Sequence, residues 1–585
     1  MSARRGVAAL AVAGLAAIGS AGPVVAQDAP PPKETSLLSR TPAGGFPNGP
    51  SFGPAISGDR QLASLTAFTS AASDLVAGDT NGVPDIFVVR RADPLADGLR
   101  GLPWRAAGPP QLVTRGLGGA PANGPSYGAD LDGDQIHDGL DARNRPEGRD
   151  APHCVAFVSA ASNLVPGDTN GLPDAFVADL RSGRIERVSV DSRGRQVFGS
   201  TYDVEVDGSC GRVAFTSDAR ALALTKSTFK RIRRPAAAAA LVSTTPRTGQ
   251  RQVYVRVLPR TREPDDLGLR GITFVASAAG GRAANGPSYD VSLGQLGRSG
   301  DCRTGCSITS GDAVAYTSEA TNLARGDRSA VPDVYKTSFA RTYFKRRGKV
   351  TYAPALHATS LVSATRAGRG GNGASGPASM NPNGRYVAFA TTASDVLPCV
   401  NLQAGTVCDT NGLSDVAVVD TGAKRPRAQW ASASAATGQP GNGASTSPSI
   451  TLYGSVFFAS DATNLQRQPA SGGLFSDRNG FRDVFFWSIQ TQSQSLQSRD
   501  SDDQIPFSAS GRQPEPGYSP ALGASAPATS AYNNYVVFES ANPALDLVTG
   551  RAAFPSLVSD RGAAEAAAAG DPRLRQAYLR YVGRR

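Results

Sequence analysis

Five aspartates crowd into one twelve-residue segment, residues 130–141, where their spacing suits a metal ion. Carboxylates stand at positions 1, 3, 5, 9 and 12 of the segment, and position 7 can offer a backbone carbonyl. Ca²⁺ takes about six to eight such hard oxygen ligands, and clustered carboxylates repel one another when no cation lies among them. The predicted ligands are Asp130, Asp132, Asp134, Ile136, Asp138 and Asp141. We therefore expect a structural Ca²⁺ site here, with a solvated acidic insertion as the alternative.

This acidic segment resembles the Asp-rich loop of thrombospondin type 3 repeats and also the loop of EF-hands. Gln135 replaces the expected turn glycine, and Asp141 stands where the EF-hand has a glutamate. A corresponding unit further along the chain has only residues 383–385 at this place. The segment is therefore an insertion, and we expect it to clamp the structure rather than to serve catalysis.

Carboxylates also recur at a fixed spacing in four segments that read Asp-x-Asn-Gly-x-x-Asp. Asp and Asn side chains bond their own backbone in turns, and glycine supplies a positive φ there. We interpret these segments as turns that scaffold the fold, with cation binding as the alternative. Their residues are Asp79, Asn81, Asp85, Asp168, Asn170, Asp174, Asp409, Asn411, Asp415, Asp477, Asn479 and Asp483.

Two segments, residues 49–53 and 124–128, match the Gly-x-Ser-x-Gly motif of serine hydrolases. A nucleophile elbow needs a strand-turn-helix context with an acid and a histidine downstream. Here the match is part of a repeated Asn-Gly-Pro-Ser segment, and another copy carries Asp290 in place of the last glycine. The chain has only three histidines, and no two are spaced as metal ligands. These motifs therefore predict no catalytic residue.

The first 26 residues have the three parts of a secretory signal peptide. Arg4 and Arg5 form a basic start, residues 7–18 are apolar and small, and residues 24–26 form a small-x-small cleavage pattern. The apolar run is too short to cross a bilayer comfortably. We expect export to the periplasm or beyond the cell, with no membrane span left after cleavage.

The six cysteines indicate disulfides, because an even count in an oxidising compartment is usually paired. Proximity along the chain favours Cys302–Cys306 and Cys399–Cys408, which leaves Cys154 with Cys210. Other pairings stay open. No Cys-x-x-Cys spacing occurs, so a zinc thiolate site is not expected.

The formal net charge is +11, with basic clusters near residues 226–234, 341–349 and 580–585. Such clusters could meet acidic polysaccharide, anionic lipid or nucleic acid. We interpret them as solvated loops, and we expect no nucleic acid partner because the chain is exported.

The elements that must position these residues come from an internal repeat. A short apolar strand with an aromatic residue occurs seven times, and Ser or Thr follows within a few positions. A period beyond about 20 residues indicates stacked supersecondary units. The copies are residues 66–68, 155–157, 213–215, 314–316, 387–389, 456–458 and 536–538.

Each copy has room for four short strands joined by Gly, Asn, Asp and Pro turns, which predicts an antiparallel meander. Seven such sheets arranged radially make an all-β, seven-bladed β-propeller. The expected order is a signal peptide (1–26), a Pro-rich segment (27–34) and one propeller domain (35–585). The expected blades are residues 48–115, 123–194, 200–277, 285–365, 374–434, 444–498 and 515–585. The Asp-x-Asn-Gly turns then surround the ligand-facing end of the central channel.

The two ends of the chain complement each other. The seventh copy stops after its third strand at residues 576–580, and residues 35–40 look like a fourth strand that precedes the first copy. We infer that residues 35–41 close the ring by pairing with the last blade, which removes two open sheet edges.

The repeats resemble the TolB-like β-propeller family, a WD40-like family of exported bacterial proteins. The resemblance rests on the Val-Ala-Phe strand at 155–157, the Ala-Ser-Asn-Leu segment at 161–164, and the Asp-x-Asn-Gly turn with its Asp-x-Phe-Val strand at 168–177. Gln252 and Gln576 stand at the usual aspartate of the third strand in copies three and seven. The family implies the fold and export.

Propellers of this family mostly serve as binding platforms, although a fold does not fix a function. We expect a non-enzymatic platform that binds a protein or cell-envelope ligand at one end of its channel, with no organic cofactor. One alternative is a lyase or hydrolase of acidic polysaccharide that pairs carboxylates from different blades. Another is a structural surface protein.

Overall fold

The computed structural model describes most of the chain from residue 34 onward. The described residues are 34–59, 62–92, 104–133, 152–232, 236–259, 269–294, 313–339, 343–346, 349–352, 357–402, 405–434, 437–465, 482–498, 524–529, 535–540 and 575–582. They belong to one compact unit, Pro32–Arg585. The predicted signal peptide lies outside the described residues.

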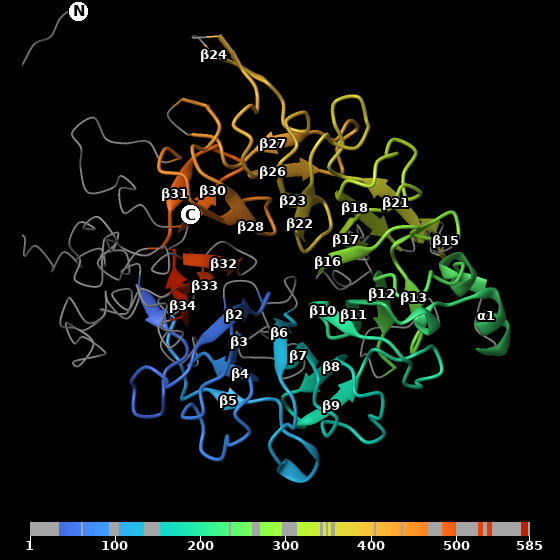
Figure 1. Ribbon diagram of the computed structural model, residues 1–585, viewed down its shortest axis with the longest axis vertical. Coiled ribbons are helices and arrows are strands. Elements are labelled where there is room, and N and C mark those ends of the chain that lie inside the picture. Colours follow the sequence, from blue (N-terminus) through green and yellow to red (C-terminus); the bar gives the residue numbers. More distant parts are fainter. Residues whose placement is uncertain are drawn as a thin grey trace, which may run out of the picture. The chain divides into compact units, whose positions relative to one another are not determined.

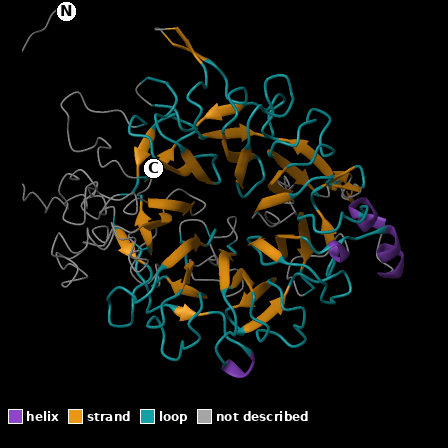
Figure 2. Cartoon of the chain, in the orientation of Figure 1, coloured by secondary structure: helices purple, strands orange, loops and turns teal. Residues whose placement is uncertain are grey.

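Seven four-stranded antiparallel sheets form most of the described part of this unit (Figures 1 and 2). The first, innermost strands are β2 (Ser51–Ile56), β6 (Ser126–Leu131), β10 (Thr201–Val206), β16 (Ser288–Leu293), β22 (Ser375–Met380), β28 (Ser445–Ile450) and β32 (Ala524–Thr529). The second strands are β3 (Leu65–Ser70), β7 (Cys154–Ser159), β11 (Arg212–Ser217), β17 (Ala313–Ser318), β23 (Tyr386–Thr391), β29 (Val456–Ser460) and β33 (Tyr535–Ser540). The third strands are β4 (Asp85–Arg90), β8 (Asp174–Asp179), β12 (Gln252–Val257), β18 (Asp333–Ser338), β26 (Asp415–Asp420), β30 (Asp483–Trp487) and β34 (Gln576–Tyr581). The fourth strands are β5 (Gln111–Leu112), β9 (Arg184–Arg187), β13 (Thr273–Val275), β21 (Ala358–Leu361), β27 (Ala428–Trp430), β31 (Gln494–Leu496) and, in the last sheet, β1 (Thr35–Leu37).

The sheets follow one another around a centre that the innermost strands surround (Figure 1). Each innermost strand contacts the innermost strands of both neighbouring sheets, and β32 contacts β2. The sheets therefore close into the predicted seven-bladed propeller, with blade 1 beginning at β2 and blade 7 at β32.

The core lies in the second and third strands, which pack between neighbouring blades. Every residue of β7 is buried, and Phe157 in it stacks on Phe176 of β8 with ring centroids 5.7 Å apart. Equivalent rings stack in blades 1, 3, 4, 6 and 7. Each ring removes a large apolar surface from water, which explains why the Val-Ala-Phe pattern recurs.

The strand β1 takes the fourth-strand position of blade 7. It pairs antiparallel with β34, with Thr35 opposite Arg580. Beyond it, the Ser39 hydroxyl donates to Gln576 Oε1 at 2.7 Å. In blades 1 to 6, a Ser or Thr hydroxyl after the fourth strand bonds the first residue of the third strand in the same way. The contribution of this pairing to stability stays a prediction.

The remaining elements lie in the connections between these strands. They are the hairpins β14 (Ala278–Ala279) with β15 (Arg282–Ala283), β19 (Tyr343–Arg346) with β20 (Lys349–Tyr352) and β24 (Val400–Leu402) with β25 (Gly405–Val407), the helix α1 (Lys226–Ile232), and the 3-10 turns η1 (Leu117–Gly119), η2 (Arg220–Leu222) and η3 (Ala236–Leu241). Within the described ranges, no helix has the length and apolarity needed to cross a membrane.

Candidate functional site

A repeated hydrogen bond joins the inner strands of neighbouring blades. The fifth residue of one inner strand accepts it from the backbone N–H of the sixth residue of the next. Asp130 accepts from Val206 at 2.8 Å, Glu205 from Leu293, Ser292 from Met380 at 3.0 Å and Ser379 from Ile450 at 3.2 Å. A neutral hydroxyl is therefore sufficient in blades 4 and 5, whereas blades 2 and 3 use ionisable carboxyl groups.

Two further carboxyl groups lie beside these, and together they form an acid cluster of Asp130, Asp203, Glu205 and Asp290. Burial raises the pKa of Asp130 from 3.8 to about 7. Burial, with the charge of Asp130 added, raises the pKa of Glu205 well above its usual 4.5. Burial also raises the pKa of Asp203, and it raises that of Asp290 to about 6 with the help of the Asp203 charge. Buried acids poised near neutral pH are typical of functional sites.

Sequence analysis found only Asp130 of this acid cluster, and assigned it to a different site. The other three residues carry no motif of their own. The signal that could have found them is the alignment of the inner strands, which places acids at the third and fifth positions of β10 and at the third position of β16.

An aromatic row lies on the same strands, at the second position of the inner strands of blades 1 to 4. Its members are Phe52, Tyr127, Tyr202 and Tyr289. The Arg251 guanidinium lies 3.7 Å from the centre of the Tyr202 ring, and the Tyr202 hydroxyl donates to Asp218 at 3.0 Å. The Tyr289 hydroxyl donates to Glu319 at 3.1 Å. Burial raises the pKa values of Asp203 and Asp290, and the positive charge of Arg251 partly offsets this effect by lowering both.

Among the described residues, three of the four exposed large apolar side chains lie at the same end of the strands, and we call them the apolar face. They are Leu117, Phe198 and Tyr202, which are 52%, 80% and 38% exposed. The Leu117 N–H donates to Asn163 O at 2.8 Å, and Asn170 Nδ2 donates at 3.1 Å to the carbonyl of the residue before Phe198. Both segments are therefore bonded to the same β7–β8 loop of blade 2. The fourth residue, Tyr453, lies between β28 and β29, at the other end of the strands.

The predicted Ca²⁺ segment begins at the end of β6. Asp130 accepts the bond from blade 3 described above, and Asp132 accepts the N–H groups of His153 and Cys154 at 2.8 and 2.9 Å. Asp134, Ile136, Asp138 and Asp141 lie outside the described residues. The structure thus shows other partners for two of the six predicted ligands, and the Ca²⁺ site stays a prediction.

The Asp-x-Asn-Gly turns join the second strand of a blade to the third, at the same end as the apolar face. In blade 1 the Asp85 carboxylate accepts the Thr114 hydroxyl at 2.5 Å and Asn81 Nδ2 at 2.6 Å, and Asn81 Oδ1 accepts the N–H of Val83. These are bonds that a structural turn requires. Asp79, Asp168, Asn170, Asp174, Asp409, Asn411 and Asp415 hold the corresponding places, Asp483 begins β30, and Asp477 and Asn479 lie outside the described residues.

The Gly-x-Ser-x-Gly matches have a structural explanation. Ser126 is fully buried at the start of β6, where its hydroxyl donates to Ser159 Oγ at 2.8 Å. Two residues later, Gly128 has a φ of +66° at a shift in the β6–β7 register. Ser51 and Gly53 are placed in the same way in blade 1. These serines have no exposed hydroxyl to act as a nucleophile.

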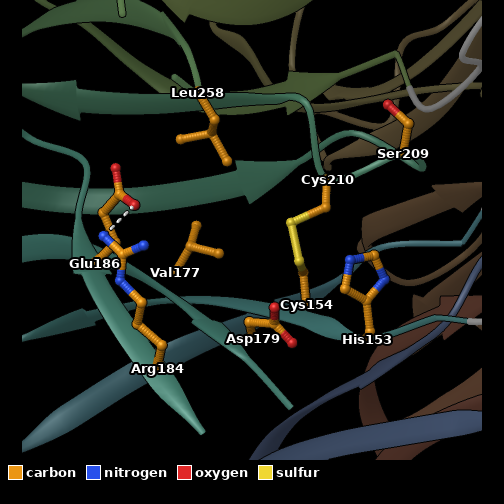
Figure 3. A pocket seen from close by; sticks show the side chains of 9 residues that line it. All are labelled: His153, Cys154, Val177, Asp179, Arg184, Glu186, Ser209, Cys210 and Leu258. Carbon is orange, nitrogen blue, oxygen red and sulfur yellow. Dashed lines mark hydrogen bonds and ion pairs between the residues drawn. A yellow bond between two sulfur atoms is a disulfide. The ribbon is translucent and has the colours of Figure 1, made fainter. Parts of the chain in front are cut away.

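Two of the expected disulfides are confirmed, Cys154–Cys210 and Cys399–Cys408. Cys302 and Cys306 lie outside the described residues. Cys154–Cys210 links blade 2 to blade 3 and borders a cavity of about 130 Å³ (Figure 3). The lining residues are His153, Cys154, Val177, Asp179, Arg184, Glu186, Ser209, Cys210 and Leu258. Asp132, His153, Cys154 and Cys210 lie close enough together to be considered as ligands of one metal ion, and His153 Nδ1 lies 3.0 Å from Asp132 Oδ2. Because the two sulfurs are bonded to each other, only Asp132 and His153 of this group could bind a metal.

No protein-family model matches the sequence, and the curated proteins contain no match. Solved structures with a similar fold include a putative TolB from Agrobacterium tumefaciens, 11% identical over 66% of this chain and 83% of that one, with a TM-score of 0.28. An oligogalacturonate lyase in complex with manganese is 10% identical over 94% of this chain and 96% of that one, with a TM-score of 0.37. A puromycin-hydrolyzing peptidase of Mycobacterium tuberculosis is 11% identical over 89% of this chain and 54% of that one, with a TM-score of 0.38. TolB proteins are thus among the solved structures found, and the propeller fold and its blade count rest on this chain's own strand pairing.

Proposed function

We propose that this chain is an exported, non-enzymatic binding platform that holds a protein of the cell envelope against the apolar face. The observation that carries the proposal is the exposure of Phe198, at 80%. An aromatic ring left in water forgoes the free energy of burial that the rest of the fold obtains. Export is supported by the two disulfides, which persist in oxidising compartments.

The backbone that presents Phe198 packs closely against blade 3. The next residue, Gly199, has a φ of +145° and packs so closely on Ala219 that a Cβ atom there would collide with it. Beside it, Arg251 and Tyr202 form a stacked pair that Asp218 orients. Tyr and Arg are enriched where binding energy concentrates in protein interfaces, and a preformed surface loses little entropy on binding.

The test is affinity capture with the full mature chain from envelope and secreted fractions of its own host. Phe198→Asp should reduce the amount of the captured protein at least tenfold, because the change places a charge in the contact. Tyr453→Asp, which adds the same charge at the other end of the strands, should leave capture unchanged. Equal capture by the parent and Phe198→Asp would refute the apolar face as the binding surface.

The acid cluster favours a second candidate function, cleavage of an acidic polysaccharide. Asp203 and Asp290 lie on neighbouring inner strands, both have a raised pKa, and Arg251 is close to both. Two such acids and a nearby cation are the groups that general acid–base chemistry on an anionic glycan requires. The assay is the release of new reducing ends from acidic polysaccharides. Activity that Asp290→Asn abolishes would establish this candidate, and activity that survives the change would exclude these carboxylates.

A further inference from the structure

In blade 2, the two aspartates of the repeated turn share one positively charged side chain. Arg187 Nη1 lies 3.2 Å from Asp168 Oδ1 and 3.3 Å from Asp174 Oδ2. Gln196 Nε2 donates to the same two oxygens at 2.8 and 3.1 Å. All three charged side chains are at least nine-tenths buried. This turn therefore holds two carboxylates around a single cation.

Blade 5 has the same two carboxylates without the arginine. Arg187 lies in β9, and its register position in blade 5 is taken by Trp430 of β27. Asp409 and Asp415 are 3% and 0% exposed, and within the described residues neither forms an ion pair. Asp409 Oδ2 is buried, and no group in the described ranges donates a hydrogen bond to it. Burying two negative charges without a partner is costly, so the pair needs either a cation or a shared proton to balance it.

We propose that Asp409 and Asp415 bind a divalent cation, Ca²⁺ by the chemistry of the ligands, where blade 2 has the guanidinium of Arg187. Two carboxylates balance the charge of the ion, and hard oxygen ligands with added water are what Ca²⁺ prefers. The serine hydroxyl of Ser432 and the amide of Asn411 orient the Asp415 carboxylate, which holds it in place for the ion.

Blade 4 carries a second site of this kind, formed by Asp327 and Asp333. The spacing of the two aspartates is the same, although Ser and Ala replace the Asn-Gly pair between them. A Cβ atom at Gly370 would collide with Asp333 Oδ2 and would lie 3.2 Å from Asp327 Oδ1. Both carboxylates therefore face the room that this glycine leaves. Leu361, an apolar residue, takes the register position of the blade 2 arginine.

The test measures bound Ca²⁺ per full mature chain that carries Asp134→Ala and Asp138→Ala, so that the predicted acidic loop does not contribute. Asp409→Asn should lower the count by one, and it should remove the Tb³⁺ emission that Trp430 sensitises. Arg187→Leu should raise the count by one, because it vacates the place of the cation in blade 2.

A folding defect cannot imitate this pattern, since Asp409→Asn removes a charge repulsion and should melt no lower than the parent in EDTA. The competing arrangement is a proton shared by the two carboxyl groups. An unchanged Ca²⁺ count in Asp409→Asn, with Arg187→Leu also unchanged, would overturn the proposal in favour of the proton.

Discussion

Replacing Asp130 by asparagine should stabilise the protein at pH 8 and change its stability little at pH 4. Asparagine keeps an acceptor oxygen for the Val206 N–H, which lies 2.8 Å from Asp130 Oδ2, and loses the charge. Ser292 accepts the equivalent bond with a neutral hydroxyl at 3.0 Å. The bond between blades therefore does not need a carboxylate.

The sign and size of the effect follow from the pKa of Asp130, which burial raises from 3.8 to about 7. Between these values the folded chain holds a proton that the unfolded chain has released. The stability that this gives is fully present below pH 3.8 and is lost as the pH rises through about 7. One pKa unit corresponds to about 1.4 kcal/mol, so the loss in the free energy of unfolding reaches about 4 kcal/mol. Asp130→Asn should recover about 2 to 4 kcal/mol of it at pH 8.

The assay is urea unfolding at about pH 4, 6 and 8 in EDTA. Ser379→Asp is the matched variant, because it adds a carboxyl group at the same strand position of blade 5. It should lose stability at pH 8 and keep it at pH 4. A gain for Asp130→Asn that is equal at all three pH values, or a loss at pH 8, would refute the argument from charge.

Three further predictions concern stability. Replacing Cys154 and Cys210 by serine removes a disulfide between residues 56 apart in the sequence. The free energy of unfolding measured in urea should fall by about 4 kcal/mol, and reduction of the parent should have the same effect. A loss of less than about 1 kcal/mol would contradict the loop-entropy account. Deleting residues 35–41 removes β1 together with the buried side chains of Leu37 and Leu38. Burial of these two leucines contributes roughly 3 to 6 kcal/mol, so the melting temperature should fall, whereas an unchanged melting temperature would disprove closure. Asp134→Ala with Asp138→Ala should lower the melting temperature only in Ca²⁺, and equal melting with the parent in Ca²⁺ would eliminate the acidic-loop site.

The fold could be predicted because its signal is local and repeated. All seven apolar-aromatic segments form second strands, as Val155-Ala156-Phe157 does in β7, because each must bury the same ring between the same neighbours. The helix α1 could not be predicted in this way. It lies in the basic segment 226–234, which we interpreted as a solvated loop and which has no helical counterpart in the described residues of the other blades.

The candidate site was harder to predict because it depends on contacts between blades. The pKa of Glu205 is raised by burial and by Asp130, a residue of the previous blade, and no sequence window contains both. The aspartates of blade 4 were missed for a different reason. Ser329 and Ala330 replace the Asn-Gly pair, which removed the motif while the spacing of Asp327 and Asp333 remained.

The sevenfold repeat lets one blade serve as a control for another, and this comparison is why we assign the proposed function to blades 2 to 4. At the fifth position of the inner strand, blade 1 has Ala55 and blade 5 has Ser379, so the fold itself does not require an acid there. Asp130 and Glu205 nevertheless keep half-buried carboxyl groups whose raised pKa values lower stability at neutral pH. The exposed Phe198 is a second local cost in the same arc. Departures from local consistency concentrate at functional sites, and these two independent departures on adjacent blades are the reason that we place the proposed function here rather than on another part of the symmetric fold.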